Sequence, residues 1–214
     1  MLKTLVNFTK KDLVFSLSSG LITGIVASFL FDFLKFKPVV FGSWKALIVI
    51  IPIVWVIGVF IGSFVASKIK FLGWLFQFSK FIAVGFLNTI IDLGVLNLLI
   101  AWTGRSNGLS YSGFKAVSFL VAVFNSYFWN KYWTYKSGQE KSSNEFLKYF
   151  IVTFIGFLLN VGVSSLIVNL ISPKFGLSPE LWANVGAVFG TATNLVWNFL
   201  GYKIVVFKQK QVNL

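Results

Sequence analysis

The chain has 214 residues, of which 57% are hydrophobic and 12% are charged, and its mean hydropathy is +0.82. Soluble domains are about 45–50% apolar and about 25% charged, so this composition predicts an integral membrane protein. Cysteine and histidine are absent from the sequence, which excludes disulfides and removes the commonest general base and metal ligand. We therefore expect no metal, no cofactor and no enzymatic activity.

The formal net charge of +13 would also suit a nucleic-acid-binding protein. The basic residues, however, lie between apolar runs, as lysines and arginines do in the loops of membrane proteins, where they meet anionic headgroups. We therefore expect anionic lipids as partners of this charge, and no nucleic acid.

Six segments are long and apolar enough to cross a bilayer, which takes about 20 residues. In chain order they are 13–34, 46–67, 80–102, 113–133, 146–171 and 181–203. Pro52 lies inside the second segment, where neighbouring helices of a membrane bundle can satisfy the carbonyl that it frees. The sequence thus predicts an all-α integral membrane protein with about six transmembrane helices. We expect no removable signal peptide, because no small-residue cleavage site accompanies the first segment.

The distribution of basic residues predicts the orientation of these spans. With six spans, both termini and the second and fourth loops share one side, which holds thirteen lysines, whereas the other side holds six lysines and arginines. Because basic residues gather on the cytoplasmic side, we expect both termini to be cytoplasmic.

An internal repeat appears when residues 78–98 are laid on residues 146–166, with seven identities in 21 positions. Each repeat unit contains two spans, so both copies have the same orientation, as in some transporters. This predicts a core of four helices at 73–214, made of two parallel two-helix repeats, and an added N-terminal hairpin at 1–72.

The added hairpin carries small residues at four-residue spacing, which permit close helix contact. They are Gly20, Gly24 and Ser28 in the first span and Gly58, Gly62 and Ala66 in the second. We expect this contact within the hairpin or between protomers. A small bundle can need a second copy to enclose a pathway, so a homodimer is an open alternative.

Asp92 is the acidic residue that lies near the middle of a predicted span. An ionised carboxylate at that depth costs several kcal/mol unless it is paired, hydrated or protonated. Asn88 precedes it by four residues and shares its helix face. This pattern favours contact with a substrate headgroup or a protonatable coupling site. The alternative is helix packing through hydrogen bonds between the two side chains.

The other three core spans each carry one stripe of polar or small residues. The candidate binding residues on these stripes are Asn125 and Trp129 in the fourth span, Asn160 in the fifth and Asn194 in the sixth. Convergence of four such stripes predicts a polar interior, although interhelical hydrogen bonding would by itself use any single asparagine.

The fourth and sixth spans end alike, with a lysine, three residues and then an aromatic–lysine pair. The fourth supplies Asn130, Lys131 and Lys136, and the sixth supplies Lys203. Ammonium groups and aromatic rings at headgroup depth suit a lipid phosphate or pyrophosphate. General snorkelling of lysine side chains toward water is the alternative explanation.

Two motifs together resemble the GtrA-like family. The first is FIAVGFLNTIIDLGV at 81–95, and the second is WNKYWTY at 129–135, in which Tyr135 replaces the usual phenylalanine. The resemblance covers about residues 76–208 and leaves the N-terminal hairpin outside the usual four-span pattern. It implies a place in cell-surface polysaccharide synthesis at the plasma membrane. Members are thought to move polyprenyl-phosphate-linked sugars across the membrane, or to assist the glycosyltransferases that use them.

The leading hypothesis is therefore a flippase or translocation component for a polyprenyl-phosphate-linked sugar. In it, Asn88, Asp92, Asn125, Asn160 and Asn194 line the headgroup route, and Lys131, Lys136 and Lys203 capture the phosphate. One alternative is a proton-coupled exporter of small solutes that uses Asp92. Another is a non-transporting membrane anchor that recruits a glycosyltransferase through the loop at 137–145 and the basic tail.

Overall fold

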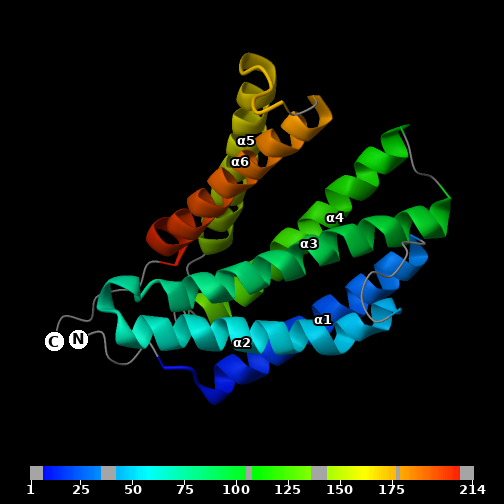
Figure 1. The fold of residues 1–214 in the computed structure, drawn as a ribbon. Coiled ribbons are helices and arrows are strands. Elements are labelled where there is room, and N and C mark those ends of the chain that lie inside the picture. The colour runs from blue at the N-terminus through cyan, green and yellow to red at the C-terminus, as the bar shows by residue number, and fades with distance from the viewer. Residues whose placement is uncertain (1–6, 35–41, 105–107, 136–143, 177–178, 208–214) are drawn as a thin grey trace. The chain divides into compact units, whose positions relative to one another are not determined.

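The structure is a computed structural model that describes residues 7–34, 42–104, 108–135, 144–176 and 179–207, and every regular element in these ranges is helical (Figure 1). The long helices are α1 (Lys10–Phe33), α2 (Leu47–Lys68), α3 (Leu75–Thr103), α4 (Gly108–Trp129), α5 (Glu145–Leu170) and α6 (Pro179–Gly201). Short 3₁₀ turns, η1 (Trp44–Ala46) and η2 (Lys70–Leu72), flank α2. Each predicted span coincides with one long helix, with ends displaced by a few residues.

Three of the described helical stretches are long and apolar enough to cross a membrane: Lys10–Phe33, Trp44–Lys68 and Leu75–Thr103. Their outward surfaces carry many exposed large apolar side chains, such as Phe29 and Phe60. Broad apolar surface of this kind is rare on soluble monomers and suits contact with lipid. The prediction of an all-α membrane protein is confirmed.

The chain forms two compact units, at 1–136 and 137–214. In the first unit, α1 packs against both α2 and α3, and α3 packs against both α2 and α4. In the second unit, α5 and α6 pack against each other as a helical hairpin (Figure 1). The predicted division at residue 72 follows from the sequence repeat and stays a prediction.

Close backbone contact holds the α1–α2 hairpin together. A Cβ atom on Gly20 would collide with the backbone of Pro52, and one on Gly24 would lie 2.5 Å from the Leu47 carbonyl oxygen. These two glycines therefore provide the predicted packing within the hairpin. Gly62 serves another contact, because a Cβ there would lie 2.5 Å from the Ser79 hydroxyl of α3.

The fourth and sixth helices both end in a five-residue π-helical turn, η3 (Asn130–Thr134) after α4 and η4 (Tyr202–Val206) after α6. The Tyr135 N–H donates to the Asn130 carbonyl at 2.8 Å, and the Phe207 N–H donates to the Tyr202 carbonyl at 2.7 Å. Isolated π turns are uncommon and occur frequently at functional sites. Each begins one residue before the lysine at which the two span ends resemble each other in sequence.

Candidate functional site

A polar seam runs between α3 and α4 in the first unit. Asp92 of α3 is half-buried, and the Ser118 hydroxyl of α4 donates to its Oδ1 at 2.7 Å. A carboxyl group in low-dielectric surroundings is costly unless it is hydrogen-bonded. The hydrogen bond from α4 therefore offsets part of the free-energy cost of placing Asp92 in this seam.

Two asparagines extend the seam by further helical turns. Asn88 lies one turn before Asp92 on α3, and Asn125 lies two turns after Ser118 on α4. The Asn125 Oδ1 accepts from Trp129 Nε1 at 3.1 Å. The Asn88 Oδ1 and the Asn125 Nδ2 are buried without a hydrogen-bond partner among the described residues. Because a buried polar atom without a partner costs about 1–3 kcal/mol, these atoms are available to a polar ligand.

The π turn η3 places Asn130 and Lys131 in buried surroundings. Asn130 is 1% exposed, and its Nδ2 donates to the Ser126 carbonyl at 2.9 Å and to the Ser126 hydroxyl at 3.2 Å. Lys131 is 7% exposed, and its Nζ donates to the Tyr127 hydroxyl at 3.2 Å.

Trp129 belongs to an aromatic cluster in the first unit rather than standing alone at its surface. Its ring packs edge-on against Phe15 of α1, with centroids 5.5 Å apart, and against Trp133, with centroids 6.0 Å apart. The indole ring of Trp129 is therefore engaged in aromatic packing, and its Nε1 donates to Asn125 as described above. The predicted Lys136 lies outside the described residues.

A buried ion pair close to η3 was not predicted from the sequence. The Lys80 Nζ of α3 lies 2.5 Å from the Asp12 Oδ1 of α1, and the two side chains are 2% and 0% exposed. The Trp133 Nε1 donates to the same oxygen at 3.2 Å. The other oxygen of Asp12 accepts from the Thr9 hydroxyl at 2.6 Å and from the Thr9 N–H at 3.0 Å.

The sequence does contain signals for this pair. Thr9 and Asp12 have the spacing of a capping box at the start of a helix, and the structure contains that box. Lys80 lies within an apolar segment, and the predicted topology places the beginnings of the first and third spans on the same side of the membrane. An acid and a base on one side at neighbouring span ends indicate a possible pair, which a count of loop charges overlooks.

In the second unit, the predicted asparagines lie at the contact between α5 and α6. The Asn198 Nδ2 donates to the Asn194 Oδ1 at 2.8 Å. Both side chains pack onto Gly156 of α5, where a Cβ atom would collide with them. Asn160, one turn further along α5, is half-buried. The bond between these two asparagines lies within α6, their contact with α5 is at Gly156, and the role of Asn194 in substrate binding stays a prediction.

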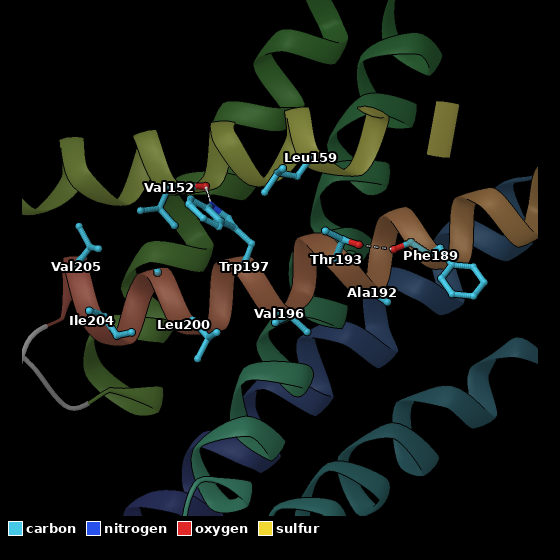
Figure 2. Close-up of a pocket in the computed structure, with 11 residues that line it drawn as sticks. Val152, Leu159, Phe189, Ala192, Thr193, Val196, Trp197, Leu200, Ile204 and Val205 are labelled. Atoms are coloured by element: carbon cyan, nitrogen blue, oxygen red, sulfur yellow. Dashed lines mark hydrogen bonds between the residues drawn. The ribbon is translucent and has the colours of Figure 1, made fainter. Parts of the chain in front are cut away.

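The second unit also carries an apolar groove of about 630 Å³. Figure 2 shows its lining side chains, with Val152 and Leu159 from α5 and the others from α6 and η4. The Trp197 Nε1 donates to the Val152 carbonyl at 3.0 Å, which fixes the indole at the groove. An apolar lining of this kind suits a hydrocarbon chain better than a charged headgroup.

The lysines of the two π turns differ in exposure, since Lys131 is buried and Lys203 is not. Lys203 of η4 is exposed, and its Nζ lies 5.9 Å from the centroid of the Phe199 ring, one turn earlier. Lys131 has the same relation to Tyr127, at 5.4 Å. The structure thus gives the two predicted phosphate-binding lysines equivalent local positions within their own units. Convergence of all four polar stripes on one interior stays a prediction.

The model of the GtrA/DPMS transmembrane domain matches residues 80–207. The chain belongs to the GtrA/DPMS transmembrane domain family. It is also similar to the uncharacterized membrane protein YngA of Bacillus subtilis (strain 168), with 30% identity over 155 residues that cover 72% of this chain and 91% of that protein. No solved structure matches the chain.

The limits of the GtrA/DPMS domain divide the features described above. The polar seam, both π turns and the donors Lys80 and Trp133 lie within the matched residues. Asp12 and the rest of the α1–α2 hairpin lie outside them. The buried ion pair therefore joins the family domain to a segment that the family model does not include.

Proposed function

We propose that this protein is a flippase, or a translocation component, for polyprenyl-phosphate-linked sugars in cell-surface polysaccharide synthesis. It would act in the plasma membrane with both termini in the cytoplasm. Membership of the GtrA/DPMS family supports a substrate of this class. The observation that carries the proposal is the polar seam between α3 and α4, with Asp92 held at 2.7 Å by Ser118.

The seam has the chemistry that a sugar headgroup needs inside a membrane. Sugar hydroxyls both donate and accept hydrogen bonds, and the seam offers acceptors on Asp92 and Asn88 and a donor on Asn125. In this proposal, the headgroup replaces part of its hydration with these atoms while the lipid tail stays in the bilayer. The free-energy cost of moving the headgroup across the membrane falls, because fewer of its hydrogen bonds are left unmade.

A lysine at the π turn of either unit would hold the phosphate on the cytoplasmic side. A phosphate in scarce water needs cationic or N–H donors, and Lys131, Lys136 and Lys203 are the candidates. Lys203 is exposed, and Lys131 is buried with its Nζ bonded to the Tyr127 hydroxyl. Anionic lipids would compete for the same groups, and a glycosyltransferase on the far side would consume the translocated sugar.

Transport in sealed vesicles tests the proposal. The purified full chain would be reconstituted, and entry of a short-chain polyprenyl-phosphate-linked glucose into the lumen would be measured. We expect Asp92→Asn to slow entry at least about tenfold, because it removes a charged acceptor, whose hydrogen bonds are about twice as strong as neutral ones. Asp32→Asn is the matched control, since Asp32 is exposed at the end of α1, and it should transport like the wild type.

Other outcomes distinguish the remaining hypotheses. Undiminished entry with Asp92→Asn would remove the seam from the mechanism. Proton flux stimulated by a small solute, without entry of the sugar lipid, would favour the proton-coupled exporter. Retention of a glycosyltransferase by a chain that transports nothing would favour the membrane anchor.

A further inference from the structure

Two donors of the GtrA/DPMS domain converge on a single anionic oxygen. The Lys80 Nζ and the Trp133 Nε1 both bind the Asp12 Oδ1, at 2.5 Å and 3.2 Å. The Phe76 ring supports the ammonium group, whose Nζ lies 3.8 Å from the ring centroid. An ammonium group beside a fixed N–H donor is the arrangement that proteins use to bind carboxylates and phosphates. The domain thus contains a preformed oxyanion site.

The oxyanion in this site comes from outside the domain. Asp12 lies in the first turn of α1, and that turn is held by the capping box with Thr9. Thr9 itself is exposed, as are Lys10 and Lys11. Because helix ends fray, unwinding of this first turn would withdraw the carboxylate from Lys80 and Trp133.

Two residues close in the chain to members of this cluster carry buried hydroxyls. Ser16 follows Asp12 by one helical turn, and Thr134 follows Trp133 directly. The exposed fractions of these side chains are 0% and 3%, and neither hydroxyl oxygen has a hydrogen-bond partner among the described residues. A carboxylate has two oxygens, both used here, whereas a terminal phosphate has three and can engage additional donors.

We infer that Lys80 and Trp133 form a phosphate-binding site that Asp12 occupies in this structure, so that the N-terminal hairpin competes with the ligand. The assignment of that ligand to a lipid phosphate rests on the proposed function. Asp12 acts as an internal inhibitor of binding, which makes the hairpin a regulatory addition to the family domain.

Binding of farnesyl phosphate tests the inference. The full chain would be placed in phosphatidylcholine nanodiscs and titrated calorimetrically with farnesyl phosphate, farnesol or inorganic phosphate. Asp12→Asn keeps the shape of the side chain and its acceptor oxygen, and removes the competing charge. We expect it to bind farnesyl phosphate about tenfold more tightly than the wild type. The phosphate then has to displace only a neutral acceptor from Lys80 and Trp133, and hydrogen bonds to neutral groups are weaker than those to charged groups. Farnesol should show no gain.

Two further variants separate the site from general effects. The double variant Asp12→Asn with Lys80→Met removes both charges of the pair and should lose the gain in affinity. Lys148 occupies the equivalent position of the second repeat and is exposed, so adding Lys148→Met to Asp12→Asn should leave the gain intact. A folded Asp12→Asn protein that binds farnesyl phosphate no better than the wild type would overturn the inference.

The remaining arms identify the source of the phosphate. An equal gain for inorganic phosphate would uphold the site and assign it to free phosphate instead of a lipid headgroup. A gain restricted to farnesyl phosphate would assign it to the lipid. If this binding pattern holds while the vesicle assay shows no transport of the sugar lipid, the site stands and the flippase proposal fails.

Discussion

Lys80 and Lys148 occupy the same position of the internal repeat, but their surroundings are opposite. Lys80 is 2% exposed and paired with Asp12, whereas Lys148 is exposed. The neighbour of Lys148, Tyr149, is buried and stacks on Tyr202 with centroids 4.3 Å apart. The first unit thus satisfies its lysine with an acid from the hairpin, and the second unit packs an aromatic pair. The difference shows that the hairpin changes the chemistry of the repeat to which it is attached.

The largest effect expected from this difference is that of Lys80→Met. Removing one partner of a buried ion pair leaves the other charge uncompensated and typically costs about 3–5 kcal/mol. Lys148→Met should change the free energy of unfolding by less than about 0.5 kcal/mol, as surface substitutions usually do. Denaturant unfolding of the detergent-solubilised protein, followed by tryptophan fluorescence, measures both.

A double variant identifies the cause of that loss. Asp12→Asn combined with Lys80→Met removes both charges of the pair, so it should recover most of the stability that Lys80→Met loses. Equal costs for the two single lysine variants would show that the two repeat positions do not differ, and would end the comparison.

A second prediction concerns the close contact that holds Asp12's helix in place. A methyl group on Gly20 would collide with the backbone of Pro52, whereas Gly58 on the same hairpin has open space around it. Overpacking of this kind costs about 1–3 kcal/mol, so we expect Gly20→Ala to destabilise the protein by that amount. Gly58→Ala should be neutral or stabilising by up to about 1 kcal/mol, because alanine is the better helix former.

The same unfolding measurement compares these two variants. If Gly20→Ala proves as stable as Gly58→Ala, the hairpin does not depend on close contact. The support that it gives to the Asp12–Lys80 pair would then have to come from other contacts of α1.

The helices were predictable from the sequence because the length of an apolar run is a local property. The start of α3 at Leu75 and the end of α5 at Leu170 lie within a few residues of the predicted limits. The position of Asp92 beside Asn88 was also predictable, since helical periodicity decides it. Its partner Ser118 lies two turns before the predicted Asn125, but the hydrogen bond itself depends on how the helices pack.

The ion pair and the π turns were not predictable by the same reasoning. Asp12 and Lys80 lie 68 residues apart in the chain, so only packing of α1 on α3 brings them together. The charge distribution places Lys80 among the basic residues of the cytoplasmic side, and the structure shows it buried. The two π turns occur where the sequence is alike, at Lys131 and Lys203. This similarity by itself does not specify the hydrogen-bond spacing of a π turn.

Apart from the controls Lys148→Met and Gly58→Ala, the smallest effect expected is that of Trp197→Phe in the second unit. Its Nε1 donates to the Val152 carbonyl, a neutral acceptor, and such a bond contributes about 0.5–1.5 kcal/mol. Trp133→Phe in the first unit removes a donor to the charged Asp12, so it should cost more, about 1.5–3 kcal/mol. Both variants keep an aromatic ring, which isolates the loss of the N–H, and the unfolding free energies provide the measurement. A larger loss for Trp197→Phe than for Trp133→Phe would mean that Asp12 does not need the indole. Lys80 and Thr9 would then satisfy the carboxylate by themselves, and the contrast between the two units would reduce to the lysines alone.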